Sequence, residues 1–231
     1  MLYEAGEDMK KNIGIILAGG IGSRFGGDKP KQYYHILGKE MIWYSIDAFK
    51  KADKLDDFLV VLGEAEMSEG RVAAEYGVDT IVGGRTRNES LKNALDYIYE
   101  KYPQCEKVIE NNAACPMITP ELVNIFMEKL DEYDFVNTAY KITDALGAYN
   151  GRVADRNDFY LIQAPDAYRF RLLYKYFKVD SPLCHPAHQL PLLARECRYF
   201  DYVDNFKVTF PQDIEIVELL LRRRGVGGAQ I

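Results

Sequence analysis

Short, continuous apolar runs alternate along this chain with segments whose apolar residues recur every three or four positions. The first run covers residues 12–18, a helical pattern follows at 41–51, and a second run covers 58–62. A short apolar run between turn residues indicates a strand buried on both faces, which is typical of a parallel sheet. Strands that alternate with helices form right-handed βαβ units. The sequence therefore predicts an α/β fold with a mostly parallel sheet and helices on both faces.

The remaining segments continue the alternation, with one interruption. Between residues 141 and 164, Asp, Gly, Asn and Arg break up the short apolar pieces, so we expect an arm that protrudes from a Rossmann-like, three-layer body. Further strands are expected at residues 80–82, 107–110, 134–140 and 198–203, and further helices at 88–102, at 168–177, at 211–224 and from an N-cap at Thr119 to about residue 133.

Length and composition favour one soluble domain. The chain has 231 residues, of which 35 are acidic and 29 basic, giving a net charge of −6. This charge disfavours nucleic acid as a partner, because phosphate binding needs a basic surface. No apolar run approaches the ~20 residues of a membrane span, and the acidic start does not resemble a signal peptide. Four cysteines without a CxxC pair do not indicate a disulfide framework. We therefore expect a cytoplasmic domain at residues 12–224, an extension at 1–11 and a flexible tail at 225–231.

A glycine-rich loop follows the first expected strand and contains basic residues. Gly19, Gly20 and Gly22 begin the loop, and Arg24 and Lys31 come shortly after them. Ligands of open α/β sheets bind outside the carboxyl ends of the strands, and glycine lets backbone N–H groups approach an anion closely. No G-K-[ST] motif is present, and the spacing differs from the dinucleotide fingerprint. The loop alone also fits an ordinary tight turn, but the added cations predict binding of a triphosphate.

Several motifs occur in the order found in a known enzyme family. The loop reads LAGGIGSRF at residues 17–25, and PKQY follows at 30–33. On these motifs the chain resembles the sugar-phosphate nucleotidyltransferases, and it is similar in particular to the cytidylyltransferases for ribitol 5-phosphate and 2-C-methyl-D-erythritol 4-phosphate. Further matching segments are GGRTRNES at 83–90, NNAACP at 111–116, DRN at 155–157, QAP at 163–165 and NFKVTFPQD at 205–213.

The resemblance implies an enzyme that transfers CMP from CTP to a small phosphomonoester and releases pyrophosphate. Arg24 and Lys31 would hold the triphosphate, and Lys207 would stabilise the charge that develops at the α-phosphate. Arg87 would order the segment beside the nucleotide. Ser90 would contact the nucleotide, although it also fits as a cap of the neighbouring helix. The other implied nucleotide contacts are Ala18, Gly19, Gly20, Gly22, Gly83 and Gly84.

The resemblance also implies a partner chain and a metal. In the family, the segment at 141–164 corresponds to an arm that crosses to a second subunit, so we expect a homodimer in which Arg156 grips the acceptor phosphate. Asp144 and His185 are expected on the acceptor side. Mg²⁺ would bridge phosphate oxygens. Ribitol 5-phosphate is the leading acceptor, and a phosphorylated non-sugar is the alternative.

Two positions depart from the family pattern beside the expected metal. Asn112 stands where the family has an aspartate, and Cys115, which we expect to be a buried filler, stands where it has an arginine. An amide keeps an acceptor oxygen but carries no charge. We hypothesise that Glu110 supplies the missing carboxylate, since residues i and i+2 of a strand share a face; a glutamate without such a role is the alternative. The departures also leave open a degenerate relative that binds a nucleotide without turnover, and UTP or GTP in place of CTP.

One cysteine and two histidines lie close together at Cys184, His185 and His188. They are candidate zinc ligands, but no fourth ligand is evident. Recognition of the acceptor by the histidines is the alternative.

Overall fold

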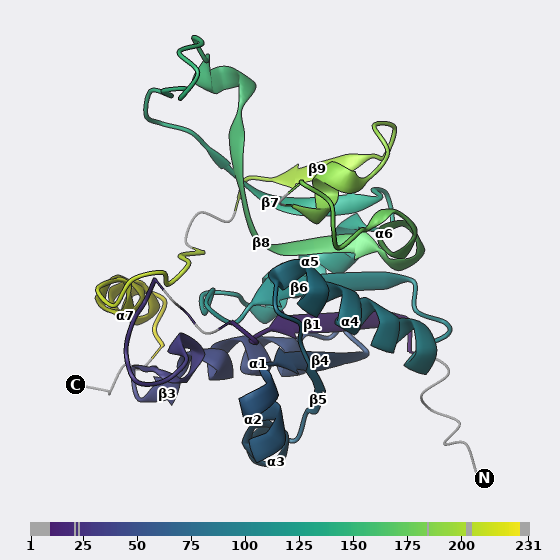
Figure 1. Cartoon of the computed structure of the whole chain (residues 1–231), viewed down its shortest axis with the longest axis vertical. Helices are drawn as coiled ribbons and strands as arrows, with labels where there is room; N and C mark the ends of the chain where they lie inside the picture. Colours follow the sequence, from purple (N-terminus) through teal and green to yellow (C-terminus); the bar gives the residue numbers. More distant parts are fainter. Residues whose placement is uncertain (1–9, 21, 23, 184, 202–204, 227–231) are drawn as a thin grey trace.

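A seven-stranded sheet forms the centre of the molecule (Figure 1). The computed structural model describes residues 10–20, 22, 24–183, 185–201 and 205–226. The strand order is β5-β4-β1-β6-β8-β7-β9; β8 runs antiparallel to β6 and β7, and the other neighbours pair in parallel. The expected mostly parallel α/β fold is therefore confirmed. The strands are β1 (Asn12–Leu17), β4 (Asp57–Leu62), β5 (Asp79–Val82), β6 (Lys107–Asn112), β7 (Phe135–Lys141), β8 (Tyr160–Arg169) and β9 (Glu196–Tyr199).

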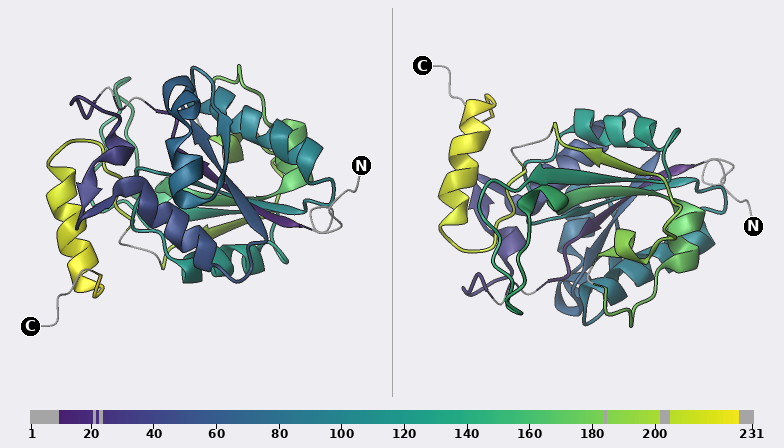
Figure 2. Two further views of the ribbon diagram at one scale, coloured as in Figure 1. Left: turned by 90° about the horizontal axis from the view of Figure 1, so that it is seen from below. Right: turned by 90° about the horizontal axis from the view of Figure 1, so that it is seen from above.

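Helices cover both faces of this sheet (Figure 2). Side chains of β1 alternate between the faces, so Ile16 joins the core under α1 and α5, whereas Ile13 and Ile15 join the core under α4 and α6. The helix α7 packs beside the sheet against the hairpin of β2 and β3. The α-helices are α1 (Met41–Lys51), α2 (Glu64–Glu69), α3 (Arg71–Tyr76), α4 (Arg87–Lys101), α5 (Pro120–Lys129), α6 (Phe170–Tyr176) and α7 (Asp213–Arg223). The short strands of the hairpin are β2 (His35–Ile36) and β3 (Lys39–Glu40), and the 3-10 helices are η2 (Lys31–Tyr33), η3 (Arg156–Asp158) and η4 (Pro186–Gln189).

The strand β8 lies where the sequence predicted the end of the arm and the start of a helix. Tyr168, expected in a helix at 168–177, belongs to β8, and α6 begins at Phe170. Polar residues and Pro165 interrupt the apolar pattern of this strand and hide it. The register against β7 shifts beside that proline, as expected for a residue that cannot donate to a ladder.

Other boundaries differ by a few residues. The helix α5 ends at Lys129 rather than near residue 133, and α2 and α3 lie in a stretch for which we expected no helix. Much of the expected extension (1–9) and tail (227–231), and the end of the strand expected at 198–203, lie outside the described residues. Within the described part of the chain, no helix is both long and apolar enough to cross a bilayer.

The expected arm is a two-stranded ribbon. Residues 138–141 of β7 pair with residues 160–163 of β8, and residues 142–159 connect them in a tip that projects away from the body (Figure 1). Tyr149 and Val153 in the tip are fully exposed. Apolar side chains gathered on a projecting segment are typical of a surface that contacts another protein.

The packing of α1 on β1 generates a stability prediction. A Cβ added at Gly14 would lie 2.6 Å from the ring of Phe49 and 2.9 Å from Leu55. We expect Gly14→Ala to lower the free energy of unfolding by about 1–3 kcal/mol, as overpacking of a dense core does. Urea denaturation measures this change. The control is Gly147→Ala in the arm, where an added Cβ meets nothing within 4 Å; equal midpoints for the two variants would contradict the prediction.

Candidate functional site

A cavity of about 570 Å³ opens at the carboxyl ends of the parallel strands. Its lining comes from the loops that follow β1, β4, β5 and β6 and from the segment before α7. This is the position that an open α/β sheet offers to a ligand. The cavity therefore lies where the sequence predicted the nucleotide site.

Three cations predicted to act on a triphosphate line this one cavity: Arg24, Lys31 and Lys207. Lys31 Nζ donates to the carbonyl of Val208 at 2.9 Å, which links η2 to the irregular segment before α7. Burial, followed by the positive charge of Lys207 and then that of Arg24, lowers the pKa of Lys31. Like charges held this close repel one another, so the arrangement favours an anion between them.

The glycine loop packs closely against its surroundings at two positions. An added Cβ at Gly19 would lie 3.2 Å from the backbone of Leu62. Gly22 has a φ of 68°, and an added Cβ there would meet the stem of Lys31 at 3.3 Å. Gln32 Nε2 donates to the carbonyl of Ala18 at 2.6 Å and fixes the start of the loop against η2. Glycine at these positions is therefore required by the backbone and by its neighbours.

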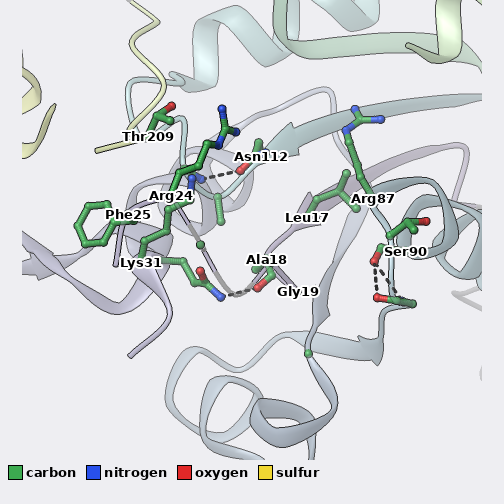
Figure 3. A pocket seen from close by; sticks show the side chains of 18 of the residues that line it. Leu17, Ala18, Gly19, Arg24, Phe25, Lys31, Arg87, Ser90, Asn112 and Thr209 are labelled. Carbon is green, nitrogen blue, oxygen red and sulfur yellow. Dashed lines mark hydrogen bonds between the residues drawn. The ribbon is translucent and has the colours of Figure 1, made fainter. Parts of the chain in front are cut away.

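The amino end of α4 forms the opposite wall. Thr86, not Ser90, caps this helix, and its capping box with Glu89 is complete. Ser90 Oγ instead accepts a hydrogen bond from the Gly84 N–H at 3.1 Å and lines the cavity. Gly83 lies behind the lining, where its N–H donates to the Leu62 carbonyl. Figure 3 shows Ser90 on the same side of the cavity as Arg87.

Arg87 links the cavity to a buried carboxylate. Figure 3 shows Arg87 across the cavity from Arg24. Its Nη2 donates to Glu110 Oε1 at 2.8 Å, and the charge of Glu110 raises the pKa of Arg87. Glu110 is 2% exposed and is not part of the cavity lining. The carboxylate that we hypothesised as a metal ligand is thus held by Arg87, and we do not assign Glu110 to a metal.

The chain offers little to a metal by itself. Asn112 lines the cavity, but its Oδ1 already accepts a hydrogen bond from the Ala114 N–H at 2.9 Å. Among the described residues, no three His, Cys, Asp or Glu side chains are grouped to hold an ion. A divalent ion would therefore depend on phosphate oxygens for most of its ligands, as Mg²⁺ commonly does.

The predicted acceptor residues lie outside this cavity. Arg156 donates to the carbonyl of Thr143 within the exposed arm, where Asp144 also lies. His185 begins η4, and its Nε2 lies 3.1 Å from Asp166 Oδ2. None of the three is brought to the cavity of its own chain.

The two cysteine predictions have different outcomes. Cys115 is 1% exposed, and burial raises the pKa of its thiol to about 11, so it is a buried filler as expected. The zinc hypothesis involves Cys184, which lies outside the described residues, and His185 is bound to Asp166 instead.

Sequence reasoning missed several lining residues. Gly63 and Glu64 directly follow β4, so the rule that ligands bind at the carboxyl ends of strands could have found them. The other missed lining residues lie within the motifs that carry the family resemblance, although no role was assigned to them there; they are Leu17, Phe25, Gln32, Arg85, Thr86, Ala113, Ala114 and Thr209.

Comparisons with known proteins agree with this geometry. The profile of the 2-C-methyl-D-erythritol 4-phosphate cytidylyltransferase family (IspD) matches residues 13–223. The enzyme of that name from Alkaliphilus metalliredigens is 26% identical over 92% of this chain and 94% of its own length. The bifunctional ribulose 5-phosphate reductase/CDP-ribitol pyrophosphorylase Bcs1 of Haemophilus influenzae is 29% identical over 93% of this chain and 49% of its own length. The crystal structure of 4-diphosphocytidyl-2C-methyl-D-erythritol synthase from Anaerococcus prevotii shares the fold, with a TM-score of 0.78, 20% identity and coverage of 93% of this chain and 99% of that one.

The fold and these relatives define a nucleotidyltransferase. Within that class, the chain belongs to the 2-C-methyl-D-erythritol 4-phosphate cytidylyltransferase family, which confirms the resemblance seen in its motifs.

The cation cluster generates a binding prediction that needs no nucleobase. We expect Lys31→Met to weaken binding of inorganic tripolyphosphate about 10- to 100-fold, because a charge-assisted hydrogen bond contributes about 1.5–3 kcal/mol. Calorimetric titration at low salt measures the affinity. Lys29→Met is the matched control, since Lys29 is exposed and lies over the ring of Tyr34 rather than in the cavity. A similar loss in both variants would mean that the cavity does not select the anion.

Proposed function

We propose that the protein transfers CMP from CTP to the phosphate of a small sugar or polyol phosphate and releases pyrophosphate. The observation that carries this proposal is the convergence of Arg24, Lys31 and Lys207 on one cavity beside the glycine loop. Ribitol 5-phosphate is the leading acceptor, because Bcs1 carries a CDP-ribitol pyrophosphorylase activity in its name, and 2-C-methyl-D-erythritol 4-phosphate is the second candidate.

In the reaction, a phosphate oxygen of the acceptor attacks the α-phosphorus of CTP. The bond from that phosphorus to the bridging oxygen breaks, and pyrophosphate leaves with the electron pair. Arg24 and Lys31 stabilise the triphosphate and the leaving charge, and Lys207 stabilises the charge at the α-phosphate. The loop at 18–22 and the Gly84–Ser90 turn bind the cytidine. The protein thus acts by positioning and by charge stabilisation.

The proposed ion is argued from the phosphates of the substrate, and the proposed compartment from the cysteines of the chain. Mg²⁺ would be held mostly by phosphate oxygens and would neutralise part of their charge, and in the cavity lining Asn112 Oδ1 keeps a second lone pair that could serve as a ligand. We place the reaction in the cytoplasm, because the described cysteines Cys105, Cys115 and Cys197 are free thiols, as is usual in a reducing compartment.

A second copy of the chain completes the site in this proposal. Arg156 lies in the exposed arm and does not reach the cavity of its own chain, so it would act on the acceptor phosphate of a partner. The exposed apolar side chains of Tyr149 and Val153 in the tip support such a contact. Asp144 belongs to the same arm and would face the same acceptor.

Turnover is tested by pyrophosphate release from CTP with ribitol 5-phosphate, 2-C-methyl-D-erythritol 4-phosphate and a panel of phosphorylated non-sugars. We expect Lys207→Ala to lower kcat about 100- to 1,000-fold on the best acceptor, as loss of one transition-state contact does. Lys29→Ala is the control. Binding of CTP without release on any acceptor would favour the degenerate relative instead. The same assay with UTP and GTP decides the base.

The arm is tested by mixing two inactive variants. Arg156→Ala and Lys207→Ala damage different halves of a shared site. In a mixed dimer, one site has Lys207 from one chain and Arg156 from the other and is intact, so an equilibrated equal mixture should recover about a quarter of the normal activity. Each variant alone is the control. A mixture no more active than its components would show that the arm acts on its own chain or not at all.

A further inference from the structure

A group of charged residues lies buried directly behind Arg87. Glu110 on β6 and Asp166 on β8 are cross-strand partners, and both are 2% exposed. Arg87 reaches Glu110 from the amino end of α4, at 2.8 Å. His185 reaches Asp166 from the start of η4, at 3.1 Å. Four separate segments therefore bring two carboxylates and two bases together, and only Arg87 among them lines the cavity.

The charges of this group balance when the Asp166–His185 pair holds one proton. Burial raises the pKa of Asp166, and its hydrogen bond with His185 opposes that shift. Two buried carboxylates side by side repel each other and lack water to screen them. Arg87 supplies one positive charge, and its pKa responds to Asp166 as well as to Glu110. Burial alone would lower the pKa of His185, but its hydrogen bond to Asp166 and the negative charges of Asp166 and Glu110 outweigh burial and raise it.

Two further titratable groups lie beside this cluster of charges. Burial raises the pKa of Tyr168, so this residue stays neutral and adds no charge. The His188 ring lies with its centroid 5.6 Å from that of His185 but is exposed to solvent. Glu110 Oε2 and Asp166 Oδ1 are buried without a hydrogen-bond partner among the described residues, so both carboxylates have an oxygen available to a second donor.

We propose that His185 is a positioning residue for Arg87. Protonated His185 neutralises Asp166, which leaves Arg87 paired with Glu110 alone and facing the nucleotide. Without that proton, Asp166 competes for the guanidinium and draws it away from the cavity toward both carboxylates. This inference rests on the proposed function, in which the cavity binds CTP.

The sign of the pH effect follows from linkage. The arrangement that presents Arg87 carries one more proton, so CTP affinity is highest at low pH and falls as pH rises through the titration of His185. By reciprocity, CTP binding takes up a proton at this group. The terminal phosphate of CTP titrates near pH 6 or somewhat above. The informative quantity is therefore the difference between variants in how their CTP affinity changes with pH, because the titration of CTP is common to all of them.

The test is calorimetric titration with CTP from about pH 6 to about pH 8.5, the range in which histidine titrates. Asp166→Asn removes the competing charge, so we expect this variant to bind CTP tightly across the whole pH range. Its CTP affinity should then change with pH only as far as the titration of CTP itself requires. We expect His185→Gln to bind about tenfold more weakly at low pH, a typical coupling between sites, and the double variant to recover. His188→Gln is the control and should follow the wild-type curve.

The possible results separate the two proposals. Identical curves of CTP affinity against pH for the wild type and Asp166→Asn would overturn the positioning role. A double variant that binds CTP as weakly as His185→Gln would overturn it too. If His185→Gln does not fold, as circular dichroism would show, the comparison of wild type with Asp166→Asn still decides the matter. Failure of the wild-type protein to bind CTP at any pH would instead refute the proposed function. A merely structural histidine would shift stability without changing the slope of affinity against pH.

Discussion

The convergence of Arg24, Lys31 and Lys207 on one cavity is the constraint on which the proposed site depends. Packing cations together is unfavourable without an anion. The pKa of Lys31 is lowered first by burial and then by the positive charges of Lys207 and Arg24. The sheet holds them together because the loops after parallel strands share one edge. The hydrogen bond of Lys31 to the Val208 carbonyl joins segments that are far apart in sequence. A ligand that neutralises these charges relieves the repulsion and stabilises the folded state.

The same edge explains how the arm is positioned. Since β8 runs antiparallel to β6 and β7, the strand β7 points the same way as β6, and the β7–β8 ribbon leaves the body from the edge where the cavity opens.

The two departures from the family pattern, Asn112 and Cys115, lie in one turn at the end of β6. Asn112 Oδ1 accepts a hydrogen bond from the Ala114 N–H, and Cys115 is buried with its N–H donating to the Asn112 carbonyl at 2.7 Å, so this turn accommodates both side chains.

The fold could be predicted from sequence wherever a local pattern decided it. The apolar runs of β1 and β4 and the periodicity of α1 needed no distant information, and the glycine loop marked the site. The strand β8 was missed because its neighbours on both sides, rather than its own alternation, stabilise it around Pro165. Glu110 was hypothesised as a metal ligand because residues 110 and 112 of one strand share a face. Arg87, which pairs with Glu110 in the structure, lies on the helix α4, and only the three-dimensional structure brings the two side chains together.

The exposed tip of the arm has a consequence for how such a catalyst works in a dilute solution. A reaction centre that borrows a side chain from a neighbour exists only while two molecules are associated. In the proposed dimer, the total activity therefore rises more steeply than in proportion to protein concentration while association is incomplete, and in proportion to it once association is complete. In the proposed dimer, the β7–β8 ribbon with its tip at residues 142–159 would thus make the activity depend on how much of the protein is present.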